Sequence, residues 1–373
     1  MAGIYIHIPF CKKACHYCNF HFSTSLRLKD DMIDAICREL ILQNKFLDGE
    51  IINTIYFGGG TPSILEPIEI DRILNTIHKY FHVETDIELT LEANPDDLDK
   101  KKILALQLSG VNRLSIGVQS FYDRDLEWMN RSHNSGQAHQ VIRDAMESGV
   151  TNLNIDLIFG SPTTTNEMWE NNLSMAMEYG IKHLSCYALT VEDKTALGHF
   201  VKTGKEVNPD EKAIQEQYDI CRRFLSAKGF IHYEISNYAL ENHFAIHNTS
   251  YWKGLKYLGI GPSSHSFNGF NRYWNVSNNK KYIDSLAHDI VPVEKEKLSE
   301  TDTFNEYLMT GLRTMWGCDE TYVNEKLKTN KDLEHHLNNH LEAGHIKLRN
   351  GRYIMTEEAW LTSDSIIADL FIE

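Results

Sequence analysis

Short stretches of alternating apolar and polar residues recur along the first half of the chain, separated by longer amphipathic stretches. The short stretches have the period of two expected of β-strands, and they span residues 4–9, 51–57, 86–92, 113–118, 152–159 and 183–189. The longer stretches carry apolar residues at helical spacing, and they span residues 29–46, 67–80, 97–108, 135–148 and 166–179. This repeated order of strand and helix predicts an α/β fold with parallel strands.

Each predicted strand has one apolar face and one polar face. In residues 86–92, for example, Ile87, Leu89 and Leu91 lie opposite Glu88, Thr90 and Glu92. Parallel strands covered by helices on both faces are apolar throughout, and a closed eight-stranded barrel fills its interior with branched side chains. We therefore expect an open, partial (β/α)6 barrel of TIM-like plan, with an outer helix layer and a polar lumen that holds a ligand.

The pattern changes after residue 208. We predict a helix over 209–228, a strand over 230–236 and an aromatic, histidine-rich loop over 247–269. Helical stretches follow at 301–315, 320–327 and 333–343, and two short strands around Asn350-Gly351 precede a last helix. These elements predict three parts: a barrel core over 1–208, a barrel extension over 209–297, and a smaller, mostly helical C-terminal domain of winged-helix type over 298–373.

Composition and charge exclude several classes of protein. The 373 residues carry 52 acidic and 37 basic side chains, a net charge of −15, whereas binding to nucleic acid needs a positive surface. The chain has no apolar stretch long enough to cross a membrane and no secretory signal at its start. We expect a cytoplasmic protein, with peripheral membrane contact left open because no basic amphipathic helix supports it.

Three of the seven cysteines, Cys11, Cys15 and Cys18, lie within eight residues, and the other four are scattered singly. An odd number of cysteines in a chain without an export signal indicates a metal site rather than a disulfide framework. Three thiolates can hold three irons of a [4Fe–4S] cluster and leave the fourth iron open to another ligand. The alternative is a structural zinc with His16 or His21 as its fourth ligand.

Other residues suited to ligand binding follow the predicted strands. Gly58, Gly59 and Gly60 come after the second strand, where glycines let the backbone approach a ligand closely. Glu92, Gln119 and Asp156 end the polar faces of later strands, at the edge where α/β folds bind ligands. Helix capping is the alternative role for these three side chains.

Seven motifs, in order and over residues 4–270, resemble the radical S-adenosylmethionine enzymes of the HemN/HemW group. They are YIHIPFCKKACHYC, FGGGTPS, LEANP, GVQSF, NIDLIFG, YEISNYA and HNTSYW. The resemblance implies a radical S-adenosylmethionine barrel in which Cys11, Cys15 and Cys18 ligate a [4Fe–4S] cluster. It also implies an electron donor, whose electron splits S-adenosylmethionine into a 5′-deoxyadenosyl radical.

The same resemblance assigns the cofactor contacts. Those for S-adenosylmethionine are Tyr5, Tyr17, Gly59, Gly60, Thr61, Glu92, Gln119, Arg131, Asp156 and Ala188. When the resemblance is set aside, the sequence is equally consistent with Arg131 as a surface charge at a helix end.

Within this group, the oxygen-independent coproporphyrinogen III oxidases decarboxylate a porphyrin precursor, whereas HemW-like members bind heme and deliver it. The chain has Phe20 where the oxidases carry a fourth cysteine, and a shorter segment before the cysteines. Both differences favour a heme chaperone, with heme or a porphyrin as ligand and an unidentified acceptor protein as partner. Gly160-Ser161-Pro162 and residues 261–266 also depart from the usual motifs, on the side expected for the substrate.

The HNxxYW stretch adds candidate heme contacts. Histidine is an axial ligand of heme iron and aromatic rings can cover the macrocycle, so His247, Tyr251, Trp252 and His265 are the expected contacts. His243 is a further candidate, and a purely structural role for His247 is the alternative. A zinc-stabilised binding protein without redox chemistry is the remaining hypothesis for the whole chain.

Overall fold

The computed structural model describes all 373 residues. Its central feature is a sheet in which six parallel strands follow one another in chain order. They are β1 (Ala2–Ile8), β2 (Ile52–Gly59), β3 (Val83–Ala93), β4 (Arg113–Gln119), β5 (Asn152–Phe159) and β6 (His183–Ala188). The six predicted strands are confirmed, and their ends shift by no more than three residues.

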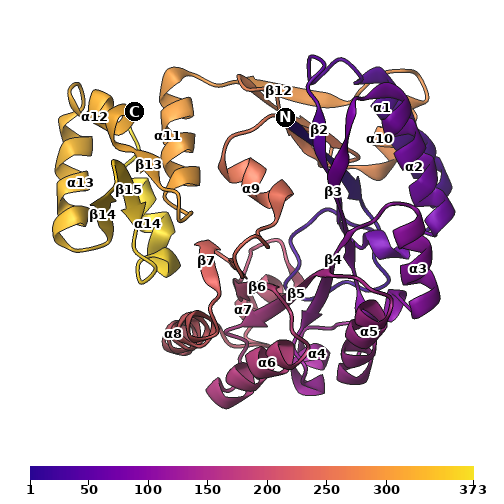
Figure 1. Ribbon diagram of the computed structural model, residues 1–373, viewed down its shortest axis with the longest axis horizontal. Helices are drawn as coiled ribbons and strands as arrows, with labels where there is room; N and C mark the ends of the chain where they lie inside the picture. The colour runs from indigo at the N-terminus through magenta and orange to yellow at the C-terminus, as the bar shows by residue number, and fades with distance from the viewer.

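Helices connect these strands and cover the outer face of the sheet (Figure 1). They are α1 (Lys29–Leu42), α2 (Pro67–Tyr80), α3 (Lys100–Leu108), α4 (Asp123–Trp128), α5 (Ser135–Glu147) and α6 (Asn166–Glu178). In α2, the helical spacing of Ile70, Ile73 and Ile77 buries all three, and each such side chain contributes about 1.5–3 kcal/mol. The helix expected from residue 97 begins at Lys100, because the Asp99 side chain accepts the backbone N–H of Lys102 at 2.7 Å.

The inner face of the sheet is polar, as the alternation predicts. Many of its side chains are nonetheless buried, which requires partners inside the barrel or a bound ligand. They are Thr54, Glu88, Thr90, Arg113, Ser115, Asn154, His183 and Ser185.

Further strands extend both edges of the sheet to a total of twelve. Beside β6 lie the antiparallel strands β8 (Asn237–Ala239) and β7 (Ile231–Glu234), which follow α7 (Ala196–Lys202) and α8 (Glu211–Ala227). Beside β1 lies the parallel strand β9 (Tyr257–Ile260), followed by the antiparallel β10 (His265–Phe267), β11 (Asn271–Asn275) and β12 (Val293–Lys297). Since β12 and β7 form two separate edges, the barrel is open, as expected.

The loop expected over 247–269 is wrong, because this segment forms α9 (Ile246–Trp252), β9 and β10. No local side chain caps α9. Instead, the Glu88 carboxylate on β3 accepts the backbone N–H groups of Ile246 at 2.9 Å and His247 at 2.8 Å. A cap supplied by a strand so distant in sequence leaves no local signal, which explains the error.

The C-terminal part is mostly helical and carries a three-stranded sheet of order β13-β15-β14. After α10 (Asn279–Leu286) and β12 come α11 (Glu300–Gly311), β13 (Cys318–Asp319), α12 (Glu320–Leu327), α13 (Lys331–Glu342), β14 (Ile346–Arg349), β15 (Arg352–Met355) and α14 (Ser363–Asp369). Short 3-10 turns are η1 (Pro62–Ile64), η2 (Pro95–Asp97) and η3 (Trp360–Thr362). Figure 1 shows this part on the opposite side of the molecule from α1 to α3, with α9 between. None of the helices is long and apolar enough to cross a membrane.

Candidate functional site

Cys11, Cys15 and Cys18 lie on the loop that leaves the carboxyl end of β1, and all seven cysteines are free thiols. The three thiols are close enough for their charges to influence one another. Burial raises the pKa of Cys11 to about 12 and also raises that of Cys18, so these thiols need a metal to become thiolates. The Cys11 sulfur already accepts a hydrogen bond, because the Thr61 hydroxyl donates to Cys11 Sγ at 3.3 Å.

The donor set fits an iron–sulfur cluster better than a single zinc ion. No group of three His, Cys, Asp or Glu side chains converges on one ion position. Thiolates that bind three different irons need wider spacing than three ligands of one ion. His16 Nδ1 bonds to the Trp128 carbonyl at 2.9 Å and His21 Nε2 to Asn279 Oδ1 at 2.7 Å, so each proposed fourth zinc ligand has one of its two ring nitrogens engaged.

Arg131 is partly buried beside the cysteine loop, which removes its reading as a surface charge. Its Nη1 donates to Cys15 Sγ at 3.3 Å and to the Tyr17 hydroxyl at 3.4 Å. Its Nη2 donates to Asn94 Oδ1 at 2.6 Å and to the Gly117 carbonyl at 2.8 Å. The guanidinium therefore supplies a charged hydrogen-bond donor directly to the Cys15 sulfur.

The glycines at the end of β2 allow close backbone approach. Gly59 has φ +109°, and a Cβ added there would lie 2.6 Å from the His7 ring. A Cβ on Gly60 would lie 2.7 Å from the Phe10 carbonyl oxygen. Only glycine fits at both positions, so the loop packs directly on the segment that carries the cysteines.

The polar residues at the strand ends fit a charged, hydroxyl-rich ligand. Glu92 accepts the Tyr56 hydroxyl at 2.7 Å and the Gly59 N–H at 3.3 Å, and burial raises the pKa of its carboxyl to about 7. Gln119 adopts φ +66° at the end of β4, and its buried Oε1 has no partner within the protein, nor has the hydroxyl of Thr90. Buried groups without partners are costly, which indicates a ligand in the lumen.

Asp156, Tyr5, Tyr17 and Ala188 complete the residues expected around the cofactor. Asp156 accepts Asn154 Nδ2 at 2.7 Å, and burial raises the pKa of its carboxyl. The Tyr5 ring stacks on Tyr56 at a centroid distance of 6.1 Å. Tyr17 packs against Leu189 and its neighbours, and Ala188 ends β6. Tyr5 and Asp156 thus lie within β1 and β5, and Tyr17 lies between Cys15 and Cys18, where its hydroxyl meets Arg131.

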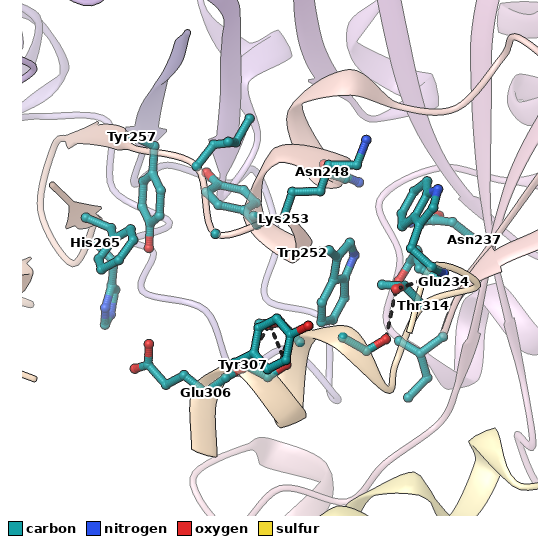
Figure 2. A pocket seen from close by; sticks show the side chains of 18 of the residues that line it. Glu234, Asn237, Asn248, Trp252, Lys253, Tyr257, His265, Glu306, Tyr307 and Thr314 are labelled. Carbon is teal, nitrogen blue, oxygen red and sulfur yellow. Dashed lines mark hydrogen bonds between the residues drawn. The ribbon is translucent and has the colours of Figure 1, made fainter. Parts of the chain in front are cut away.

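A large cavity of about 1530 Å³ lies between the barrel and the C-terminal part. Its lining includes Phe20 and His21, which follow the three cysteines, so it extends from the cysteine loop to α11 and the β14–β15 hairpin. Figure 2 shows side chains from β7, α9, β10 and α11 directed toward this common space. We refer to it below as the large cavity.

The candidate heme contacts divide into two sets. Tyr251, Trp252 and His265 line the large cavity, but His247 does not. His247 is 1% exposed, with Nδ1 bonded to the Thr54 hydroxyl and Nε2 to the Tyr251 hydroxyl, each at 2.8 Å. This conformation therefore leaves no ring nitrogen of His247 available to iron.

Several residues of the site escaped sequence reasoning. Asn94 joins Arg131 to Thr61, to which its Nδ2 donates at 3.3 Å, and Glu88 caps α9. Asn94 belongs to the LEANP motif and Glu88 to a polar strand face, so both had a signal. Arg113 is 1% exposed and its Nε has no partner, and it too lies on the polar face of a predicted strand.

Comparison with known proteins finds relatives over the whole chain. Residues 5–176 match the family model of the Radical SAM superfamily. The chain is 31% identical over 373 residues to a protein named heme chaperone HemW from Mycobacterium tuberculosis, covering 99% of this chain and 94% of that protein. It is 33% identical to a HemW of Bacillus subtilis, with 87% of each covered. The solved structure of the coproporphyrinogen III oxidase HemN from Escherichia coli has the same fold, with a TM-score of 0.87 at 21% identity over 99% of this chain and 90% of that chain.

Proposed function

The chain belongs to the HemN/HemW family of the radical S-adenosylmethionine superfamily, and from this premise we propose that it is a heme chaperone of the HemW type. It binds heme and passes it to an acceptor protein. The observation that carries the proposal is the large cavity, which is lined by Tyr251 and Trp252 of the HNxxYW motif and opens beside the cysteine loop. Its volume of about 1530 Å³ exceeds the ~300–1,000 Å³ of ordinary ligand pockets.

In this proposal Cys11, Cys15 and Cys18 hold a [4Fe–4S] cluster, and S-adenosylmethionine lies in the polar lumen. Bound there, the two groups supply one-electron chemistry, which needs an electron donor. The residues of the chain hold them: Thr61 and Arg131 donate hydrogen bonds to thiolates, and the unpartnered Gln119 side chain takes a hydrogen bond from the ligand. Gly59 and Gly60 let their loop pack directly against the segment that leads into the cysteines.

Heme lies in the large cavity, with His265 as the axial ligand of its iron. Three histidines line the cavity, His7, His21 and His265. His7 is bonded through both ring nitrogens, to the Tyr5 hydroxyl at 3.2 Å and the His21 carbonyl at 2.9 Å, and His21 is bonded through one, Nε2, to Asn279. The His265 ring is exposed and makes no hydrogen bond, so its nitrogens are open to iron. His247 then acts as a positioning residue for Tyr251.

A coproporphyrinogen III oxidase is the second candidate function. The fold that the chain shares with HemN supports this candidate. Phe20 stands where the oxidases have a cysteine, and its side chain is 70% exposed on the cavity. An apolar ring at the entrance suits a macrocycle that binds and leaves. For the heme chaperone we also expect a cytoplasmic location and an acceptor protein that receives the heme. Peripheral contact with a membrane is a further expectation.

Two measurements on anaerobically reconstituted protein test the proposal. Hemin titration should give a saturable Soret band, and His265→Ala should shift that band, whereas His247→Ala and the control His243→Ala should leave its position unchanged. Incubation with S-adenosylmethionine, reductant and coproporphyrinogen III should give no product. Formation of protoporphyrinogen over many turnovers would overturn the chaperone in favour of the oxidase, and a colourless protein with stoichiometric zinc would overturn both.

A further inference from the structure

Two cations from different parts of the fold meet at one tryptophan in the large cavity. Lys253 follows the last residue of α9, and its Nζ lies 4.8 Å from the centroid of the Trp316 ring. Arg352 begins β15, and its Nη1 donates to the carbonyls of Trp316 at 3.4 Å and Gly317 at 3.3 Å. All of these residues line the cavity. The barrel side and the C-terminal side each contribute one positive charge to the same spot.

Neither cation has a carboxylate partner. No Asp or Glu oxygen lies within ion-pair distance of Lys253 Nζ or of the Arg352 guanidinium. Arg272, in the same cavity, shows the usual outcome, because Glu306 binds it through two bonds of 2.5 and 2.8 Å. Glu234 also lines the cavity, but it is 2% exposed. In a chain with a net charge of −15, two cations that contact the same tryptophan in a cavity wall and have no carboxylate partner call for an anionic ligand.

The chemistry of the pair suits carboxylates. Arg352 uses one guanidinium nitrogen for backbone carbonyls, so its remaining N–H groups can bind an oxygen pair, and Lys253 supplies a mobile ammonium. Both side chains are exposed, so the anion keeps access from solvent. The Trp316 ring, which also lines the cavity, offers apolar surface to the body of the same ligand.

We propose that Lys253 and Arg352 bind the propionate carboxylates of the porphyrin, with the macrocycle directed into the cavity toward Trp252. This inference rests on the proposed heme binding and adds the recognition of its acidic edge. A carboxylate held by both residues bridges the barrel and the C-terminal part, so the ligand also ties these two parts together. The same two cations also explain how a chain with a strongly negative net charge binds an anionic porphyrin.

Changes in the ligand test this inference without any mutation. Hemin, metal-free protoporphyrin IX and hemin dimethyl ester are titrated into the full-length reconstituted protein and followed by absorbance or tryptophan fluorescence. We expect both free acids to bind, and the dimethyl ester, which has no carboxylates, to bind about tenfold or more weakly. Equal affinity for hemin and its dimethyl ester would overturn the inference and leave heme binding intact. Failure to bind hemin at all would overturn the proposed function, and the inference with it.

Variants then assign the effect to the two residues. Lys253→Gln/Arg352→Gln should weaken hemin and protoporphyrin IX about tenfold or more and leave the dimethyl ester unchanged. The matched control, Lys280→Gln/Lys347→Gln, removes the same charge from exposed residues that do not line the cavity. His265→Ala should weaken hemin and hemin dimethyl ester, which both contain iron, and leave protoporphyrin IX, which has none, unchanged. An equal loss in the control pair would mean that net charge, and not these two residues, governs binding, which would overturn the assignment.

Discussion

The carboxylate of Glu88, in the middle of β3, accepts the backbone N–H of His247 at 2.8 Å, so the sheet itself holds the start of α9. It accepts the neighbouring N–H of Ile246 as well, and Glu88 is 6% exposed. The start of the HNxxYW segment is therefore held by β3. Tyr251 and Trp252, on the same short helix, take their places in the large cavity from this anchor.

Glu88→Gln tests the anchor. Glutamine keeps the shape but has one acceptor oxygen and no charge for two donors, so we expect a loss of about 1–3 kcal/mol in the free energy of unfolding. Amide hydrogen exchange in α9 should become faster, while that in α2 stays the same. Glu84→Gln, at an exposed position of the same strand, is the control. Unchanged exchange in α9 would show that Glu88 does not hold the helix.

Gly59→Ala tests the close approach of the glycine loop. The added Cβ would lie 2.6 Å from the His7 ring at φ +109°, so strain of about 1–3 kcal/mol adds to the steric conflict. Gly149→Ala is the matched control, because Gly149 has φ +79° with nothing within 4 Å of its Cβ. We expect Gly59→Ala to lower the free energy of unfolding more than the control and to reduce binding of S-adenosylmethionine in equilibrium dialysis. Similar effects in both variants would argue against the contact.

Arg131→Gln tests the support of the cysteine loop. The change removes the donor to Cys15 Sγ and leaves Asn94 Oδ1 without its partner at 2.6 Å. Loss of such a contact behind a metal ligand lowers affinity about 10- to 100-fold, so iron and sulfide retained after reconstitution should fall. Arg124→Gln, at an exposed position of α4, should retain the full content. Equal iron content in the two variants would show that Arg131 does not support the cysteine loop.

Glu39→Gln tests a pH dependence of stability. Glu39 is fully buried and accepts the Gly261 N–H at 2.9 Å and Asn275 Nδ2 at 2.7 Å, and burial raises the pKa of its carboxyl from 4.5 to about 7. The folded state therefore holds a proton between these pH values that the unfolded state has lost. The free energy of unfolding must then fall as pH rises through this window, by up to about 1.4 kcal/mol per pH unit.

Urea unfolding of the metal-free protein at several values between about pH 5 and pH 7 measures this slope. Glu39→Gln should make it shallower, and Glu296→Gln, at an exposed position of β12, should leave it as in the wild type. Glu92 and Glu234, whose pKa values burial also raises to about 7, add slopes of the same sign, so part of the dependence should persist. A Glu39→Gln slope equal to that of the wild type would contradict the assignment.

The sequence by itself determined the barrel core and predicted a metal site in the cysteine loop. Strand and helix periods are local properties, so the alternation in residues 86–92 was enough to predict β3 and the polar face that carries Glu88 and Glu92. The spacing of Cys11, Cys15 and Cys18 is local too, and it indicated a metal site before any fold was known. Where the boundaries were wrong, as at Lys100, a single cap had decided them.

The tertiary structure alone decided which side chains meet. Arg131 reaches Cys15 across 116 residues, and Glu88 reaches His247 across 159, so neither contact has a signature in its own neighbourhood. For the same reason His247 is buried while His265 faces the cavity, and Lys253 and Arg352 both contact Trp316. Local periods report which face of an element is buried. The contacts across that face depend on how the elements pack, and only the folded chain defines them.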